Sequence, residues 1–194
     1  MRYALILFIL IGVKCTAPEP SKLIEKKYFD LPSFTQSIIE QQSKAKLTVL
    51  KKSIINGLQE EKVQEKSDSS FWATELFLLL SADLNKPQLQ TAYTIEEHVT
   101  ETNSNLLKTV YTALPTARSN IRKIEFKYLS SPAEIRQIIV EQATDNTVYS
   151  TQQSTHVWLN NIAGTLLIDS LVTTGFNKTI LLDSMKYSST VLIK

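Results

Sequence analysis

The side chains that could carry out chemistry are scattered along this chain and do not form a catalytic motif. The two histidines, His98 and His156, lie among polar residues in segments with strand-like alternation. A catalytic nucleophile needs a base beside it, and the chain has no G-x-S-x-G sequence. Ser43-Lys44-Ala45-Lys46 matches S-x-x-K in spacing, but the companion motifs of that enzyme class are missing. We expect both histidines to be solvent-facing strand residues and the protein to have no catalytic site.

Carboxylates could act in pairs as an acid and a base. Glu96 and Glu97 are adjacent in a predicted strand, so their side chains point to opposite faces and cannot form such a pair. Asp169 and Asp183 are candidates only because they are acidic. Asp83-Leu84-Asn85 lacks the remaining ligands and the glycine of a calcium loop, and we expect it to end a helix.

Composition excludes several kinds of site. One cysteine cannot form an internal disulfide, two histidines make a His-built metal site improbable, and four glycines argue against a glycine-rich phosphate loop. We predict no metal and no cofactor.

The first residues have the order of an export signal. Arg2 is followed by an apolar run from Tyr3 to Val13, which is too short to span a membrane, and then by Cys15, the only cysteine. This order resembles a bacterial lipoprotein signal, in which the cysteine becomes the lipidated first residue. Lys14 departs from that pattern, because a small residue usually precedes the cysteine, and a cut between Ala17 and Pro18 is the poorer alternative. We predict a signal peptide at 1–14, a lipidated Cys15 with a tether at 15–27, and a single domain at 28–194.

Charge limits the partners. Lys+Arg is 21 and Asp+Glu is 19; without Arg2 and Lys14 the balance is 19 to 19. A neutral chain has no electrostatic surface for nucleic acid and no polybasic patch for anionic lipid. The predicted membrane contact is therefore the N-terminal lipid anchor, which would hold the exported protein in the cell envelope, at the outer membrane. A further protein or lipid partner is left unidentified.

Two helices are predicted early in the domain. Asp30 is suited to cap a helix, and Leu31, Phe34 and Ile38 share one helix face, which predicts a helix at 31–43. The serines and Asp68 before Phe71 predict the start of a second helix, at 69–84, with Trp72, Leu76 and Leu80 as its buried stripe.

The segment 46–66 is compatible with a hairpin or with a helix. Asn56-Gly57 between two apolar runs favours the hairpin, whereas Leu50, Ile54 and Leu58 also have helical spacing. In the hairpin, lysines face glutamates across the turn, and we expect ion pairs there. These residues are Lys44, Lys46, Lys51, Lys52, Glu60, Glu61 and Glu65.

From Tyr93 onward the apolar residues alternate with polar ones, as in an antiparallel sheet. We expect Gly164 and Gly175 to mark turns or bulges. The segment 133–142 begins like a helix but alternates like a strand, and we interpret it as a strand. The predicted strands are 93–100, 107–111, 123–128, 133–142, 147–159, 166–174, 178–182 and 187–193.

The predicted fold class is α+β, with two early helices packed on one face of a curved antiparallel β-sheet. Aromatic residues fall on the sheet segments, where they could line an apolar groove or pack in the core. They are Tyr93, Tyr111, Phe126, Tyr128, Tyr149, Trp158 and Phe176.

Three short stretches point to a family: Tyr28-Phe29-Asp30-Leu31, Trp72 with Glu75-Leu76, and Asp83-Leu84-Asn85-Lys86-Pro87. With the leader and the late strands, the chain resembles uncharacterised exported lipoproteins of the Bacteroidota. In architecture alone it is also similar to the LolA- and LolB-like carriers and insertases of envelope lipoproteins. Neither resemblance supplies functional residues.

The function expected from the sequence is a non-enzymatic binding or scaffolding domain tethered to a membrane. The alternative is a carrier that binds a lipid or acyl chain between sheet and helices, which would need a cavity of several hundred cubic ångströms.

Overall fold

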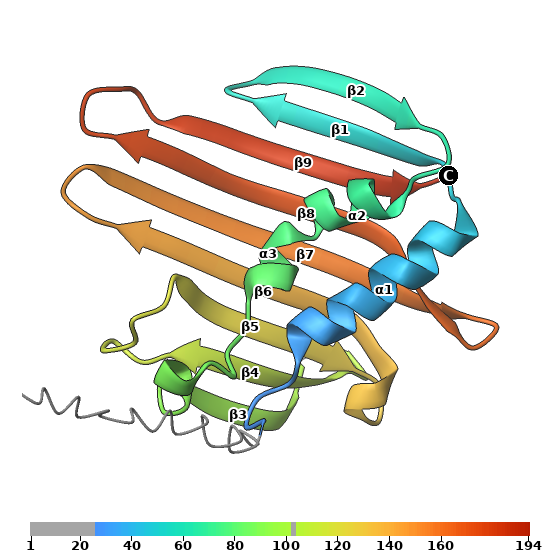
Figure 1. The fold of residues 1–194 in the computed structure, drawn as a ribbon, viewed down its shortest axis with the longest axis horizontal. Coiled ribbons are helices and arrows are strands. Elements are labelled where there is room, and N and C mark those ends of the chain that lie inside the picture. Colours follow the sequence, from blue (N-terminus) through green and yellow to red (C-terminus); the bar gives the residue numbers. More distant parts are fainter. Residues whose placement is uncertain (1–25, 102–103) are drawn as a thin grey trace, which may run out of the picture.

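The computed structural model describes residues 26–101 and 104–194 (Figure 1). The predicted signal peptide 1–14, Cys15 and most of the tether 15–27 lie outside the described residues. The helices and the short 3-10 turns are α1 (Leu31–Ala45), α2 (Ser69–Glu75), α3 (Phe77–Ser81), η1 (Pro87–Leu89) and η2 (Pro132–Glu134).

One antiparallel sheet of nine strands makes up the rest of the fold, in the order β2-β1-β9-β8-β7-β6-β5-β4-β3. Strands β3 to β9 follow one another as hairpins, and β1 then pairs with β9, the last strand of the chain. The sheet stays open, with β2 and β3 as its edges. The strands are β1 (Val49–Ile55), β2 (Leu58–Gln64), β3 (Tyr93–Thr100), β4 (Leu107–Ala113), β5 (Ile121–Tyr128), β6 (Ile135–Asp145), β7 (Tyr149–Ile162), β8 (Thr165–Thr179) and β9 (Met185–Ile193).

The local signals explain several of these elements. The Asp30 carboxylate accepts the backbone N–H of Ser33 at the start of α1, as predicted for a cap. Asn56 and Gly57 both have positive φ, 49° and 87°, which fits the tight turn between β1 and β2. The hairpin interpretation of 46–66 and the strand interpretation of 133–142 are therefore confirmed, the latter with η2 before β6.

The second predicted helix is wrong in its length. The helical run breaks at Leu76, where φ is −99° and ψ is 14°, and α2 and α3 are two short helices. With this break, Leu78 is buried together with Trp72, Leu76 and Leu79, although in a straight helix it would lie about 100° from Leu79 around the axis. Leu80 is only partly buried, contrary to the predicted stripe.

The last part of the predicted sheet also differs. A strand at 178–182 was expected from its apolar residues, but β8 continues unbroken to Thr179 and the chain then turns. Gly164 lies in the turn between β7 and β8 with φ of 83°, as expected. Gly175 lies inside β8, opposite Gln153 and Tyr187, and marks neither a turn nor a bulge.

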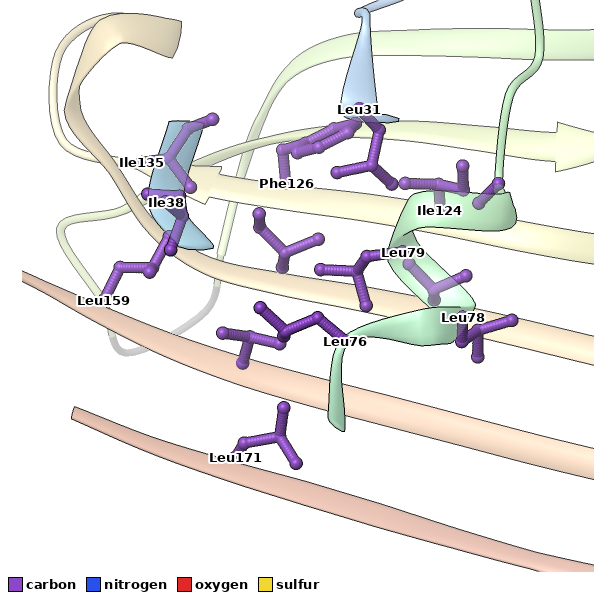
Figure 2. Close-up of a cluster of buried hydrophobic side chains, with 14 of the residues drawn as sticks. Leu31, Ile38, Leu76, Leu78, Leu79, Ile124, Phe126, Ile135, Leu159 and Leu171 are labelled. Carbon is purple, nitrogen blue, oxygen red and sulfur yellow. The ribbon is translucent and has the colours of Figure 1, made fainter. Parts of the chain in front are cut away.

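Helices and strands share one hydrophobic core (Figure 2). Leu31 and Ile38 of α1 and Leu79 of α3 lie in it with Phe126 of β5 and Leu171 of β8. The buried Gln42 of α1 forms two hydrogen bonds to the backbone of Ile168 in β8, at 2.9 and 3.2 Å. The fold is therefore α+β with a single antiparallel sheet, as predicted, with three helices where two were expected.

Candidate functional site

The side chains of β5 divide between two environments. Ile124, Phe126 and Tyr128 are buried in the shared core. The alternating residues Lys123, Glu125 and Lys127 therefore project from the other face of the sheet. Paired residues of neighbouring strands continue this second face across the whole sheet. From one edge to the other they are Glu96, Val110, Glu125, Ile139, His156, Val172, Thr190, Lys52 and Glu61.

Glu125 is the most buried charge in this row. Lys123 Nζ lies 2.8 Å and Lys127 Nζ 3.7 Å from its carboxylate oxygens, and Lys127 also reaches Glu101 at 2.5 Å. Burial alone would raise the pKa of Glu125, but the hydrogen bond to Lys123 and the charges of Lys123, Lys108 and Lys127 together outweigh it, so the pKa is lowered. The carboxylate is thus an ionised partner of two lysines and is not poised to take up a proton near neutral pH.

His156 lies two strands further along the same row. Its Nε2 is 3.1 Å from Ser154 Oγ, and its ring packs against Trp158 with centroids 5.8 Å apart. Burial lowers the pKa of His156, so the imidazole is neutral at pH 7. In residues 26–101 and 104–194 no carboxylate is hydrogen-bonded to the ring to orient it as a base, so the Ser154–His156 contact lacks the third member of a nucleophile site.

The other residues considered for catalysis are dispersed by the fold. The Ser43 hydroxyl donates to the carbonyl of Ile39 in its own helix, while Lys46 is the exposed left-handed residue that ends α1. His98 is exposed at an irregularity of the edge strand β3, with φ of 55°. Glu96 and Glu97 flank the start of that irregularity and are both exposed.

The acidic residues have structural contacts. Asp83 accepts the backbone N–H of Asn85, and the Asn85 amide bonds both backbone groups of Tyr28, so this segment stops α3 and holds the start of the domain. Asp169 is exposed and accepts from Asn160 at 3.3 Å, and Asp183 is exposed in the turn after β8. No group of three or more potential metal ligands occurs in the described part of the chain.

The aromatic residues of the sheet do not share one environment. Tyr93, Tyr111, Phe126 and Tyr128 are buried, and Tyr111 packs edge-on against Tyr28 and Phe126. Tyr149, Trp158 and Phe176 are partly or largely exposed. The first group is core, as the simpler interpretation predicted, and the seven residues do not line one groove.

The space between α1, α3 and strands β6 to β8 is nearly filled. A hollow of about 10 Å³ lies there, lined by α1, α3 and strands β6 to β8, and this is about the space of one water molecule. An acyl chain does not fit in this conformation.

A larger hollow of about 290 Å³ lies between the β1–β2 hairpin and α2. Its lining residues are polar or charged except for Phe71, and Lys51 crosses it to pair with Glu75 of α2 at 2.5 Å. Lys52 pairs with Glu61 across the hairpin at 2.9 Å, as predicted, whereas Lys51 faces Lys62 in the register. The cross-hairpin pairing therefore holds for one lysine, and the other stabilises the contact with α2.

No family model, no curated protein and no solved structure was found to match the chain. None of the helices in the described residues has the length and apolar character needed to cross a membrane.

One group of residues was misinterpreted from the sequence. Ile180, Leu181 and Leu182 were assigned to a strand, but they form an exposed turn. Three consecutive apolar residues lack the alternation of a half-buried strand, and that missing alternation was the available signal.

Proposed function

We propose that this chain is a cell-envelope lipoprotein: a non-enzymatic binding or scaffolding domain held at a membrane by acyl chains on Cys15. The observation that carries the proposal is the order of Arg2, the apolar run 3–13 and the single cysteine at position 15. Each buried methylene contributes about 0.8 kcal/mol, so several chains on one cysteine would anchor the domain stably.

The described domain offers support of a second kind. Its most buried charge, Glu125, is held by Lys123 and Lys127, and its half-buried histidine lacks an orienting acid. Both arrangements suit a binding surface better than a catalytic centre. The resemblance to exported lipoproteins of the Bacteroidota is consistent with this proposal and remains a hypothesis.

We also propose that the helices form one layer on one face of a curved sheet. The Gln42–Ile168 hydrogen bonds support this arrangement, as do the helix residues that share a core with β5 to β8. The opposite face, with Glu125, His156 and Trp158, would then be free for a partner.

The anchor is tested by the intact mass of protein extracted from the envelope of a producing cell. We expect a chain that begins at Cys15 and carries the added mass of its acyl groups. Cys15→Ser should lose the added mass and the membrane association, while the neighbouring change Thr16→Ser should keep both. An unmodified Cys15 in the wild-type protein would refute the anchor.

The carrier alternative needs α1 or α3 to move away from the sheet, because the present hollow is about 10 Å³. Native mass spectrometry of the detergent-free protein tests it. A reproducible extra mass of lipid size, beyond the acyl groups on Cys15, would favour the carrier. A bare chain mass would favour the scaffold.

A further inference from the structure

Exposed apolar side chains gather at one end of the sheet. Nine of the thirteen large hydrophobic residues exposed in the described chain lie at or beside three turns: β1–β2, β6–β7 and β8–β9. The most exposed is Leu181, at 88%, between Ile180 and Leu182 at 72% each. The other six are Ile54, Ile55, Leu58, Val148, Tyr149 and Met185. Because isolated apolar residues are normal on a surface but gathered ones mark contact sites, this end of the sheet needs an explanation.

Hydrogen bonds link the β1–β2 turn to the start of β9, and the β8–β9 turn to the β6–β7 turn. Asn56 in the β1–β2 turn donates its N–H to the carbonyl of Lys186, and its side chain accepts the N–H of Lys186. Ile180 in the β8–β9 turn donates its N–H to the carbonyl of Val148 in the β6–β7 turn. All three turns lie at the same end of the sheet in Figure 1, and we call this region the apolar end.

The chain enters the domain at this same end. Lys27 Nζ and the Tyr28 hydroxyl both donate to the carbonyl of Gln90, at 2.8 and 3.0 Å. Gln90 precedes β3, whose first residue pairs with the last residue of β4. Since the strands alternate in direction, β3 begins where β6 and β8 end.

The tether is long enough to reach from the start of the domain, beside β3, across the width of the sheet to the turn beside β9. Ten residues, 16–25, separate Cys15 from Lys26 in the sequence, and an extended chain spans up to about 3.3–3.6 Å per residue. The six strand spacings from β3 to β9 amount to roughly 29 Å at about 4.8 Å each. An anchor on Cys15 would therefore face the same membrane as the apolar end.

The chemistry of the turns favours lipid over an acidic or basic partner. Residues 145–149 and 178–186 contain two aspartates and two lysines, so they carry no net charge. Tyr149 is suited to the boundary between acyl chains and headgroups, and Lys178 and Lys186 can extend toward the headgroups. In Figure 1 the β6–β7 and β8–β9 turns extend beyond the β1–β2 turn at this end of the sheet, a shape that suits insertion between lipids.

We propose that the apolar end inserts into the surface of a lipid bilayer, with Leu181 and Leu182 as its deepest residues. This proposal rests on the proposed anchor at Cys15, which holds the domain close enough for the turns to engage. Insertion would fix the orientation of the domain, with the strands upright on the membrane. The charged face around Glu125 would then be perpendicular to the membrane surface, outside the bilayer, and would stay accessible to a partner.

The test uses the full protein purified from the envelope and returned to vesicles of phosphatidylcholine. Leu181→Cys is labelled with a thiol-reactive NBD dye, and Ile162→Cys serves as the matched control, because Ile162 is also exposed but lies at the opposite end of the sheet. We expect NBD at position 181 to shift its emission to shorter wavelength and to lose most of its fluorescence to lipids that carry a nitroxide on the acyl chain. NBD at position 162 should do neither. Because the turns are neutral, the shift should persist when the salt is raised to about 1 M.

The outcomes separate the two proposals. If the wild-type protein reacts with the dye, Cys15 carries a free thiol and the anchor is refuted. The insertion is then measured with Leu181→Cys and Ile162→Cys in a protein that also carries Cys15→Ser. Identical emission at 181 and 162 in vesicle-bound protein refutes the insertion, whatever the state of Cys15. A shift at 181 that salt abolishes also refutes it, because the contact would then be electrostatic.

Discussion

Gln42 is a polar residue with no exposed surface, and both ends of its amide are used. Its Nε2 donates to the carbonyl of Ile168 and its Oε1 accepts the N–H of the same residue. The amide thus completes the hydrogen bonding of a buried backbone position in β8 from a helix 126 residues earlier in the chain. An unpaired buried group costs about 1–3 kcal/mol.

Gln42→Leu is therefore expected to lower the free energy of unfolding by about 2–4 kcal/mol, since it leaves two backbone groups unpaired. Urea unfolding followed by circular dichroism measures this. Gln36→Leu, on the exposed side of α1, is the control and should change stability by less than about 0.5 kcal/mol. Equal stabilities for the two variants would contradict this role of Gln42.

His156 predicts a pH dependence. Because burial lowers its pKa below the usual 6.5, the unfolded chain binds the proton more readily than the folded one. The stability that this difference provides is complete above pH 6.5 and is lost as the pH falls through the lowered pKa. His156→Gln should flatten the dependence of Tm on pH in this range, as measured by thermal unfolding at a series of pH values.

A second loss of stability should remain in that variant at lower pH. The pKa of Glu125 is also lowered, from a usual 4.5, because Lys123, Lys108 and Lys127 together outweigh the cost of burial. Its contribution is present above pH 4.5 and disappears below it. A His156→Gln protein whose Tm falls as steeply as that of the wild type from pH 7 to pH 5 would contradict the assignment to His156.

At the scale of elements, the close packing of β7, β8 and β9 depends on Gly175. A Cβ at this position would lie 2.5 Å from the carbonyl oxygen of Gln152 and 2.5 Å from the hydroxyl of Tyr187. The Tyr187 ring therefore occupies the space that the Cβ of any other residue at position 175 would fill. Such pairs of an aromatic residue with a glycine on the neighbouring strand are known in sheets.

Gly175→Ala should accordingly reduce stability by about 1–3 kcal/mol, because strands must shift to admit the methyl group. Chemical denaturation measures the effect, and Thr174→Ala, at an exposed neighbouring position, is the control. Adding Tyr187→Leu should recover only part of the loss, since the contact with the Gln152 backbone remains. Full recovery would show that the tyrosine alone causes the effect.

At the scale of the whole molecule, one core joins elements that are far apart in the sequence. β1 pairs with β9, so Val49 lies opposite Ile193, and the helices contribute to the same core as β5 to β8. We expect the domain to unfold as one cooperative unit.

This expectation can be checked with two spectroscopic probes that report on different parts of the domain. The fluorescence of Trp72, which is completely buried in α2, reports on the helices alone, while far-UV circular dichroism also reports on the strands. Trp158 is changed to Phe first, so that Trp72 is the only tryptophan. Coincident midpoints in urea are expected, and an earlier loss of the Trp72 signal would show that the helices separate before the sheet unfolds.

The sequence by itself determined the features that depend on neighbouring residues. The cap at Asp30, the turn at Asn56-Gly57 and the alternation of β3 to β7 follow from local hydrogen bonding and from the period of the side chains. The absence of a catalytic motif is also a prediction from the sequence. The leader and Cys15 are likewise interpretations of the sequence alone.

Only the tertiary structure decided features that depend on residues far apart in the chain. The break at Leu76 accompanies the burial of Leu78 beside Trp72, Leu76 and Leu79, and the helical pattern of the sequence predicted only the face of Trp72 and Leu76. The apolar turn at 180–182 resembled a strand in hydrophobicity, because local composition does not say whether a partner strand is present. The place of β1 beside β9 was also undetermined by any local pattern, since burial of the shared core selects that pairing across more than a hundred residues.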